Sequence, residues 1–203
     1  MININDFIDE FFDFTANTHL FPWEVINHLD DLLAEKFNQL TDEYEISGNI
    51  AIHKTATIEQ NVIFKDRIII GENSFVGANA YLRGPVFVGK NSKIGPGCEI
   101  KQSIIYNDTA IAHFNYIGNS IIGNRINFEA GSICANHYNE RKDKEISVLF
   151  NNEIIRTQTY KLGSLVGDDS RIGANAVLSP GTILPKESIV RRLEFIEQVK
   201  ADQ

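Results

Sequence analysis

The chain has 203 residues, 43% of them hydrophobic, and carries a formal net charge of -8 with a pI near 5.1. A chain of this length can bury a substantial core within one domain. Its acidic balance argues against a nucleic-acid surface, because such a surface needs clustered cations that replace the counterions of the phosphates.

Cysteine content and hydropathy set further limits. Cys98 and Cys134 are the only cysteines, which is too few for a disulfide framework, so a reducing cytoplasm is the expected location. The N-terminal stretch MININDFIDEFF is acidic rather than basic, and no apolar run approaches the length of a membrane span. We therefore expect neither secretion nor contact with a membrane.

Residues 1–45 are expected to form a helical segment. Apolar residues recur at helical offsets within residues 5–14 and again after Pro22, a residue that suits the first turn of a helix. The apolar positions are Phe7, Ile8, Phe11 and Phe12 in the first stretch and Ile26, Leu29, Leu33 and Phe37 in the second. These helices are predicted to pack over one end of the structure that follows.

Residues 46–192 contain a strict six-residue period. The apolar residue of each hexad is often followed by glycine and, four places on, by a small side chain. The unbroken run is Ile52, Ile58, Phe64, Ile70, Val76, Leu82, Val88, Ile94 and Ile100; after slips of one residue it continues through Ile105, Ile111, Ile117, Ile122 and Phe128, and it returns as Val166, Ile172, Leu178, Leu184 and Val190.

A period of six fits neither a helix nor a meander, whose apolar positions recur near 3.6 and 2 residues. It fits short strands joined by tight corners, three to each triangular coil of a parallel β-helix. The small residue suits the narrow interior, and glycine or asparagine tolerates the positive φ of a corner. Stability is then expected to come from coils stacked at about 4.8 Å. The fold class is therefore mainly β.

Two further segments interrupt or follow the coils. The hexads vanish between residues 139 and 163, where EISVLFNNEIIRTQT alternates around Asn151-Asn152, a pattern that predicts a protruding hairpin. A long insertion in a tight solenoid is usually functional. Residues 193–203 carry Leu193, Ile196 and Val199, a spacing that predicts a short C-terminal helix.

Candidate chemistry gathers around one coil position. Arg83 and Lys101 are eighteen residues apart, each directly after an inward aliphatic residue, so they should stack on neighbouring strands. Like charges that close repel unless an anion such as a phosphate lies between them. His113 and Tyr116 follow in the next coil, and we expect all four near one corner. The plainer interpretations are solvated surface charge for the pair and a polar bend residue for His113.

Other motifs argue against competing chemistries. Although γ-class carbonic anhydrases share the hexad pattern, His113 and His137 form no HxxxxH pair, so a metal enzyme is not expected. The sequence also lacks a GxxxxGK[ST] loop. Asn115, Asn119, Asn124 and Asn127 are expected first of all to be corner residues, because asparagine suits the αL conformation.

At these residues the sequence resembles a known family. IAHFNYIGNSIIGNRINFEAGSICAN, from Ile111 to Asn136, is similar to the acetyltransferase core of the bifunctional N-acetylglucosamine-1-phosphate uridylyltransferases. It is closer still to the β-helical half of the sugar-1-phosphate nucleotidylyltransferases of the glucose-1-phosphate thymidylyltransferase-like type. FPWEVINHLDDLLAE resembles the linker that enters that β-helix, and the hairpin before YKLGSLVGDD resembles its insertion. The resemblance covers residues 20–190 approximately and implies a left-handed coil, against the usual right-handed crossover preference.

The resemblance implies transfer of an acetyl group from acetyl-CoA to the amine of a hexosamine 1-phosphate, in a homotrimer whose sites lie between subunits. Position by position, it makes His113 the general base and Asn136 the residue that orients the amine or acetyl group. It assigns Arg83 and Lys101 to the sugar phosphate and Tyr116 and Asn127 to the sugar; Lys142 and, less directly, Lys144 would reach the phosphate from an adjoining subunit. Ala174, Arg191 and Arg192 are the expected contacts of CoA.

Three departures from the family pattern keep alternatives open. The nucleotidyltransferase half is absent, so nucleotidyl transfer by this chain is not expected. Glu129 stands where the family usually has the first glycine of a GAG phrase, and the coils after Gly181 are short. A non-catalytic trimerisation or sugar-phosphate-binding module is therefore an alternative, as is an acyltransferase that depends on acyl-carrier protein.

Overall fold

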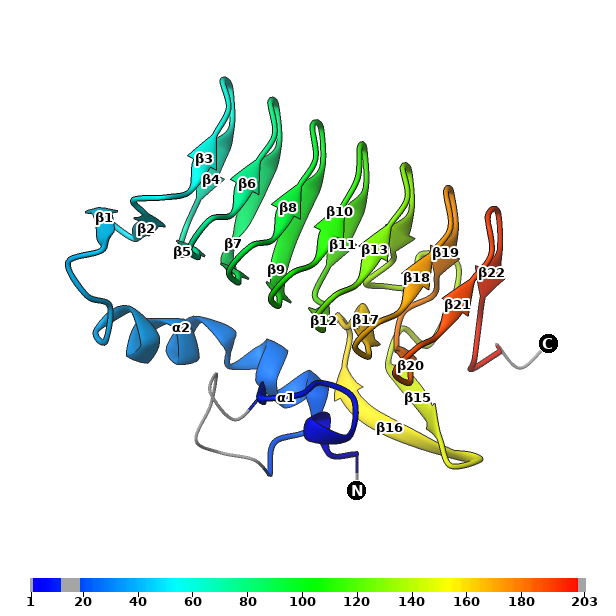
Figure 1. The fold of residues 1–203 in the computed structure, drawn as a ribbon. Coiled ribbons are helices and arrows are strands. Elements are labelled where there is room, and N and C mark those ends of the chain that lie inside the picture. Colours follow the sequence, from blue (N-terminus) through cyan, green and yellow to red (C-terminus); the bar gives the residue numbers. More distant parts are fainter. Residues whose placement is uncertain (1, 12–18, 201–203) are drawn as a thin grey trace.

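The computed structural model describes residues 2–11 and 19–200, which form a triangular parallel β-helix with a helical segment and a hairpin against one side (Figure 1). The repeat predicted from the hexads is confirmed, and the strands of the coils pair in parallel with those one coil away. We name the three sides of the prism A, B and C. No helix in the described ranges has the length and apolarity needed to cross a membrane.

Side A receives one strand from each coil, after the strands of sides C and B. It contains β4 (Ile63–Lys65), the first part of β7 (Tyr81–Val88) and of β9 (Glu99–Ile105), β11 (Tyr116–Gly118), β14 (Ile133–Cys134), β19 (Val177–Leu178) and β22 (Phe195–Ile196). The second parts of β7 and β9 turn the corner and continue on side C.

Sides B and C complete each coil. Side B is a seven-stranded sheet of β3 (Thr57–Ile58), β6 (Phe75–Val76), β8 (Lys93–Ile94), β10 (Ala110–Ile111), β13 (Asn127–Phe128), β18 (Arg171–Ile172) and β21 (Ile189–Val190). Side C contains β2 (Ile50–His53), β5 (Ile68–Ile70), β12 (Ile121–Ile122), β17 (Ser164–Val166) and β20 (Thr182–Leu184), and β1 (Tyr44–Ser47) pairs antiparallel to β2.

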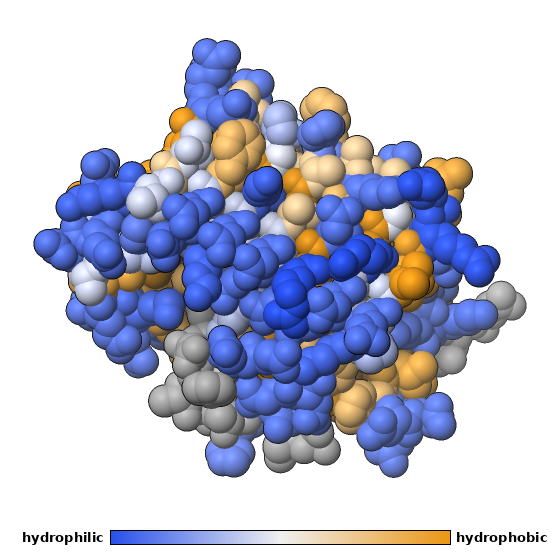
Figure 2. Space-filling view, in the orientation of Figure 1, coloured by the Kyte–Doolittle hydropathy of each residue, from blue (hydrophilic) through white to orange (hydrophobic). Residues whose placement is uncertain are grey.

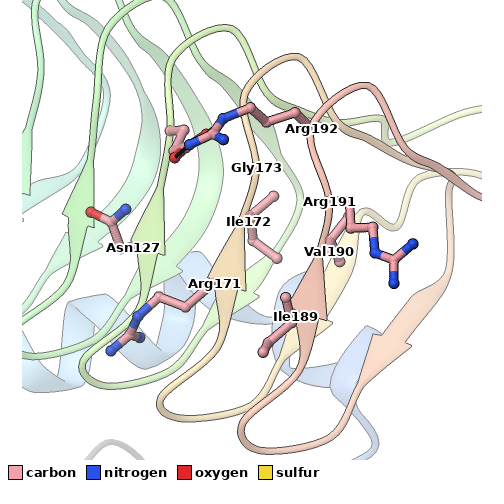
Figure 3. A pocket seen from close by; sticks show the side chains of 9 residues that line it. Asn127, Arg171, Ile172, Gly173, Ile189, Val190, Arg191 and Arg192 are labelled. Carbon is pink, nitrogen blue, oxygen red and sulfur yellow. Dashed lines mark hydrogen bonds and ion pairs between the residues drawn. The ribbon is translucent and has the colours of Figure 1, made fainter.

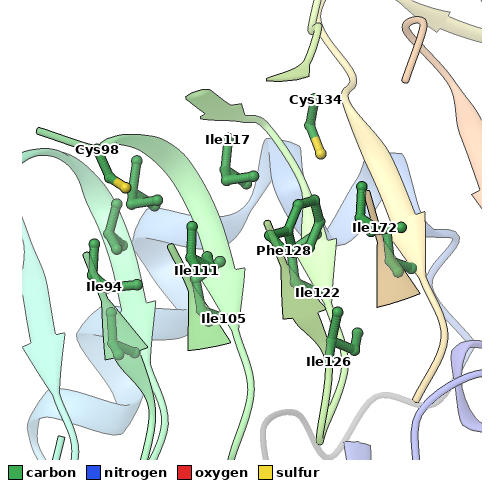
Figure 4. Close-up of a cluster of buried hydrophobic side chains, with 14 of the residues drawn as sticks. Ile94, Cys98, Ile105, Ile111, Ile117, Ile122, Ile126, Phe128, Cys134 and Ile172 are labelled. Atoms are coloured by element: carbon green, nitrogen blue, oxygen red, sulfur yellow. The ribbon is translucent and has the colours of Figure 1, made fainter. Parts of the chain in front are cut away.

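The predicted aliphatic ladder fills the prism. Most of its members, from Ile70 to Val190, are buried in one cluster, with the small residues Ala80 and Cys98 among them (Figure 4). Ser74 and Ser92, also predicted to face the narrow interior, are buried and donate their hydroxyls to the carbonyls of Gly89 and Tyr106.

The corner prediction is correct for the conformation but only partly for the residues. At the corners that follow sides B and C, the residue three after the inward aliphatic has positive φ, as in Asn73, Asn79 and Asn91. Of the four asparagines singled out above, only Asn119 adopts this conformation; Phe114 and Arg125 occupy the neighbouring αL corners. Asn115 and Asn124 are instead buried, where their side chains bond to backbone groups.

The N-terminal segment lies along side C rather than over one end of the coils (Figure 1). It contains the 3₁₀ turn η1 (Ile4–Asp6), α1 (Pro22–Asn27) and α2 (Leu29–Phe37). Pro22 begins α1, and the Glu24 carboxylate accepts the Phe21 N–H in the first turn. Phe12 and the rest of the first expected helix after Phe11 lie outside the described residues.

Hydrophilic side chains cover much of the molecular surface in the view of Figure 2.

The hairpin prediction is confirmed. β15 (Ile146–Phe150) pairs antiparallel to β16 (Glu153–Thr159), and Asn151 and Asn152 take positive φ in the turn. The hairpin leaves the coil after β14 on side A and returns into β17 on side C. Its inner face joins the N-terminal segment in a second hydrophobic cluster, where the rings of Phe7 and Phe150 lie 6.1 Å apart.

The predicted C-terminal helix is wrong for the part of the tail that the structure describes. Residues up to Lys200 continue the coil, with β22 paired to β19. Ile196 packs on the interior core six residues after Val190, and Leu193 has positive φ and is 78% exposed. The spacing of three residues thus separates a corner residue, Leu193, from the inward residue of the next hexad, Ile196. Residues 201–203 lie outside the described ranges.

Candidate active site

Arg83 and Lys101 stack on side A, as their spacing predicts. They are register partners in β7 and β9, with Lys65 paired to Arg83 on the other side. Lys101 in turn is paired with Gly118 of β11, which has no side chain to cover it. The result is a short ladder of cations at the corner between sides A and C.

A carboxylate accompanies these cations. Glu99 accepts a hydrogen bond from Arg83, with Nη1 and Oε1 2.6 Å apart, and both side chains are partly exposed. The Arg83 guanidinium also lies 5.7 Å from the centroid of the Tyr81 ring. Glu99 was not identified from the sequence, although it shares the outward position of Tyr116 in the hexad, one coil earlier.

Lys161 is a second residue that the sequence did not single out. Lys161 is exposed and lies just after the hairpin. The next two residues, Leu162 and Gly163, donate their N–H groups to the carbonyls of Asn136 and Asn119. This return path places Lys161 beside Lys101: burial, followed by the positive charges of Lys161 and Arg83, lowers the pKa of Lys101. Three cations therefore converge at the A–C corner.

Polar groups continue the site across side A. The Tyr116 hydroxyl lies over Gly118, so close that a Cβ on that glycine would be 2.6 Å from it. Asn136 contacts this phenol and donates to Asn119 Oδ1 at 2.6 Å. Burial is the main cause that raises the pKa of Tyr116, followed by the charge of Glu99. Asn136 is buried, so the network holds its amide in one orientation.

His113 lies at the other edge of the same side, on the corner between sides B and A. Its carbonyl accepts hydrogen bonds from the Gly131 N–H and the Asn115 amide, which fix the backbone of the bend, and its side chain is exposed. The expectation that all four residues meet at one corner is thus corrected. The three-residue strand β11 separates His113 from the cations, a width of roughly 10 Å, and Tyr116 lies between them.

The remaining predicted residues lie elsewhere on this chain. Asn127 is exposed on side B, paired with Ala110 and Arg171. Lys142 and Lys144 are exposed before the hairpin, where neighbouring Arg141 donates to Glu197 in the last coil. This segment therefore lies near the last coil, whose strand β22 is three strands along side A from β11.

Two of the three expected CoA contacts, Arg191 and Arg192, line a groove on side B (Figure 3). The groove has a volume of about 530 Å³ and is lined by Arg171, Gly173, Ile189, Arg191 and Arg192, together with Asn127 and Glu129. Arg192 is engaged by Glu129, which also accepts the Ala174 N–H. In the part of the chain that the structure describes, no group of three or more His, Cys, Asp or Glu side chains is arranged to hold a metal ion.

The fold and these outward side chains define a hexapeptide-repeat β-helix protein. Two family profiles agree: one described as the GMPPB C-terminal domain matches residues 65–138, and one described as the hexapeptide repeat of succinyl-transferase matches residues 165–191.

Curated relatives confirm the resemblance to the bifunctional nucleotidylyltransferases. The bifunctional sugar-1-phosphate nucleotidylyltransferase/acetyltransferase of Sulfurisphaera tokodaii is 32% identical over 166 residues, covering 79% of this chain and 41% of that protein. The bifunctional protein GlmU of Methanococcus maripaludis is 32% identical over 173 residues, covering 83% of this chain and 41% of that protein. The chain therefore spans about two fifths of the length of these relatives.

Among solved structures, a hexapeptide transferase family protein from Anaplasma phagocytophilum matches with a TM-score of 0.38 and 21% identity, over 72% of each chain.

Proposed function

We propose that this chain transfers an acetyl group from acetyl-CoA to the amine of a hexosamine 1-phosphate. One observation carries the proposal: side A presents a cationic corner of Arg83, Lys101 and Lys161 and an exposed imidazole, His113, at its opposite edge. Converging cations suit a phosphate monoester, for which arginine offers a planar fork and lysine a point charge. The name of the Sulfurisphaera tokodaii relative, a bifunctional sugar-1-phosphate nucleotidylyltransferase/acetyltransferase, supports this choice.

The polar groups between the two edges suit an amino sugar. The Tyr116 phenol and the Asn136 amide would bind its hydroxyl and amine groups. In a hexosamine 1-phosphate the amine is on the carbon next to the one that bears the phosphate. The long side chains of the cationic corner and the imidazole of His113 would therefore have to reach toward each other across β11 to hold both groups.

The reaction requires a base. An amine with an ordinary α-amino pKa is mostly protonated at neutral pH, and imidazole titrates in the range suited to accept that proton. His113 would take the proton as the amine nitrogen attacks the thioester carbonyl. The new N–C bond forms, the C–S bond breaks, and the proton returns to the sulfur of the departing CoA.

An assembly of several copies would complete the site. Lys142 is exposed near the last coil, whose strand β22 is three strand spacings, about 14 Å, from β11. Within one chain it does not meet the cationic corner. We therefore include in the proposal a homotrimer in which Lys142 of one copy reaches the sugar phosphate held by another.

The test follows free thiol after acetyl-CoA is mixed with glucosamine 1-phosphate or galactosamine 1-phosphate. The proposal predicts thiol release with at least one amine and a loss of roughly a hundredfold or more in His113→Ala. Release that never exceeds background would support a binding module, and release only with acyl-carrier donors would support the other acyltransferase.

A further inference from the structure

The groove on side B begins on the coil next to His113. Ala112 donates its N–H to the carbonyl of Phe128, and Glu129 directly follows that phenylalanine. The groove is thus one strand spacing from the corner that bears the imidazole. It holds three arginines against one glutamate, a local positive charge on a chain whose net charge is -8.

Glu129 spans two coils to reach Arg192. Its Oε2 accepts from Arg192 Nε at 2.7 Å and its Oε1 from Nη2 at 2.5 Å, while Oε2 also accepts the Ala174 N–H at 2.9 Å. The position between them on side B is Gly173, which has no side chain to block this path. Figure 3 shows the Arg192 side chain extending back over the coil that contains Gly173.

The Glu129–Arg192 ion pair is exposed enough for another anion to replace the carboxylate. The Arg192 side chain is 72% exposed and that of Glu129 is 34% exposed, and an exposed ion pair contributes only about 0–1 kcal/mol to stability. The carboxylate presents two oxygens to the guanidinium fork, the same arrangement that a phosphate would present. Arg171, by contrast, is anchored through Nη1 to the carbonyls of Arg125, Asp169 and Ser170.

We propose that Glu129 is a displaceable latch on Arg192: a phosphate of the acyl donor replaces the carboxylate, and the pair thereby sets the affinity for the donor. This inference rests on the proposed function, in which the donor is acetyl-CoA. Arg191 lies beside Arg192 in the same groove and would share the phosphate charge. The sugar phosphate, held at the A–C corner, is outside the reach of this latch.

The latch is tested by measuring CoA binding calorimetrically, without an acceptor amine. Glu129→Gln keeps the shape of the side chain and removes its charge, so we expect CoA to bind roughly three- to fivefold more tightly. Arg192→Gln should weaken binding, and Glu129→Gln should bring no gain in an Arg192→Gln background. Acetyl-pantetheine, which has no phosphate, should bind Glu129→Gln and the unaltered protein equally.

Glu153→Gln supplies the matched control, because it removes the same charge from the exposed hairpin. The inference is overturned if CoA binds none of the proteins, if Glu129→Gln leaves CoA affinity unchanged or weaker, or if the gain persists without Arg192. Thiol release is measured separately. A latch effect on CoA binding without any turnover would refute the acetyl-transfer proposal alone, whereas turnover without a latch effect would refute only the latch.

Discussion

Lys101 has two cationic neighbours, Arg83 in the adjacent coil and Lys161 in the segment that follows the hairpin. Arg83 is its register partner one coil away, a position set by the repeat, and Lys161 arrives with the chain that returns from the hairpin. Together with burial, these charges lower the pKa of Lys101. A bound phosphate would relieve the repulsion, so the same cluster that is unfavourable alone becomes favourable with its ligand.

This arrangement predicts a pH effect with a defined sign. Phosphate binding uses the protonated Lys101, so KM for the sugar phosphate should rise as the pH increases through the lowered pKa of this lysine. Lys161→Ala removes one like charge and should move that rise to higher pH, while KM at neutral pH increases roughly five- to tenfold through loss of a charged contact. Steady-state kinetics across pH give both quantities.

The control for this prediction is Lys54→Ala, which removes an exposed lysine from the first coil. It should leave KM and its pH dependence unchanged. An alkaline limb that does not move in Lys161→Ala would show that Lys161 does not influence the ionisation of Lys101.

For individual residues, the sequence predicts the contacts that follow from the six-residue repeat and misses those that do not. Arg83 and Lys101 are eighteen residues apart, so their stacking follows from the repeat. Lys161 and the Glu129–Arg192 pair depend on the path of an insertion and on a side chain that crosses two coils. The sequence separations of Lys101 from Lys161 and of Glu129 from Arg192 are not multiples of the coil length. The repeat therefore does not predict that these groups lie close together.

The N-terminal segment is an element fastened by one buried carboxylate. Asp168 is fully buried and accepts the N–H groups of Asp9 and Asn124 at 2.9 and 2.6 Å, while its own N–H donates to the Phe7 carbonyl. Lys186 forms an ion pair with Asp9 beside it. Three successive coils thus hold residues 7–9 against the corner between sides C and B.

Asp168→Ala is expected to destabilise the fold by about 2–3 kcal/mol, because the N–H groups of Asp9 and Asn124 and the buried Asn124 amide lose their acceptor. The measurement is denaturant unfolding, combined with hydrogen exchange at residues 7–9, where protection should fall first. Asp169→Asn is the comparison: it removes the charge of a partly exposed neighbour that pairs with Arg125, and asparagine tolerates the positive φ of this position. Equal losses for the two variants would contradict the role of Asp168.

Among the helices and strands, those with a clear local sequence pattern are predicted correctly, and the others are not. The coil and the hairpin follow from aliphatic spacing and from the Asn151-Asn152 turn. The C-terminal strand was misinterpreted because Leu193, Ile196 and Val199 mimic a helical face, although Val190 and Ile196 maintain the step of six. The placement of α1 and α2 along side C depends on tertiary packing that helical periodicity does not specify.

For the whole molecule, the covering of side C limits how copies can associate. The N-terminal segment and hairpin bury that side within the chain, whereas sides A and B lack such a cover in the described residues (Figure 1). The edge between A and B also exposes Phe114, Leu193 and Phe195. This edge, next to His113, is the surface we expect neighbouring copies to share in the proposed trimer.

A shared site can be tested by mixing two inactive variants. If Lys142 acts on a site whose His113 belongs to another copy, His113→Ala and Lys142→Ala chains refolded together should regain activity. Random trimers would carry both intact residues at about a quarter of their sites. No recovery, with trimers verified by light scattering, would place both residues of each site in one chain or remove Lys142 from it.

We propose that Arg83, Lys101 and Lys161 bind the phosphate and thereby hold the adjacent amine within reach of His113. This proposal is tested by the rate of N-acetylated product formation from glucosamine 1-phosphate and from unphosphorylated glucosamine, each with acetyl-CoA. We expect product from the phosphate ester and a kcat/KM at least about a hundredfold lower for glucosamine, from loss of charge-assisted bonds of 1.5–3 kcal/mol each. Equal rates for the two amines, or no product from either hexosamine 1-phosphate, would contradict it.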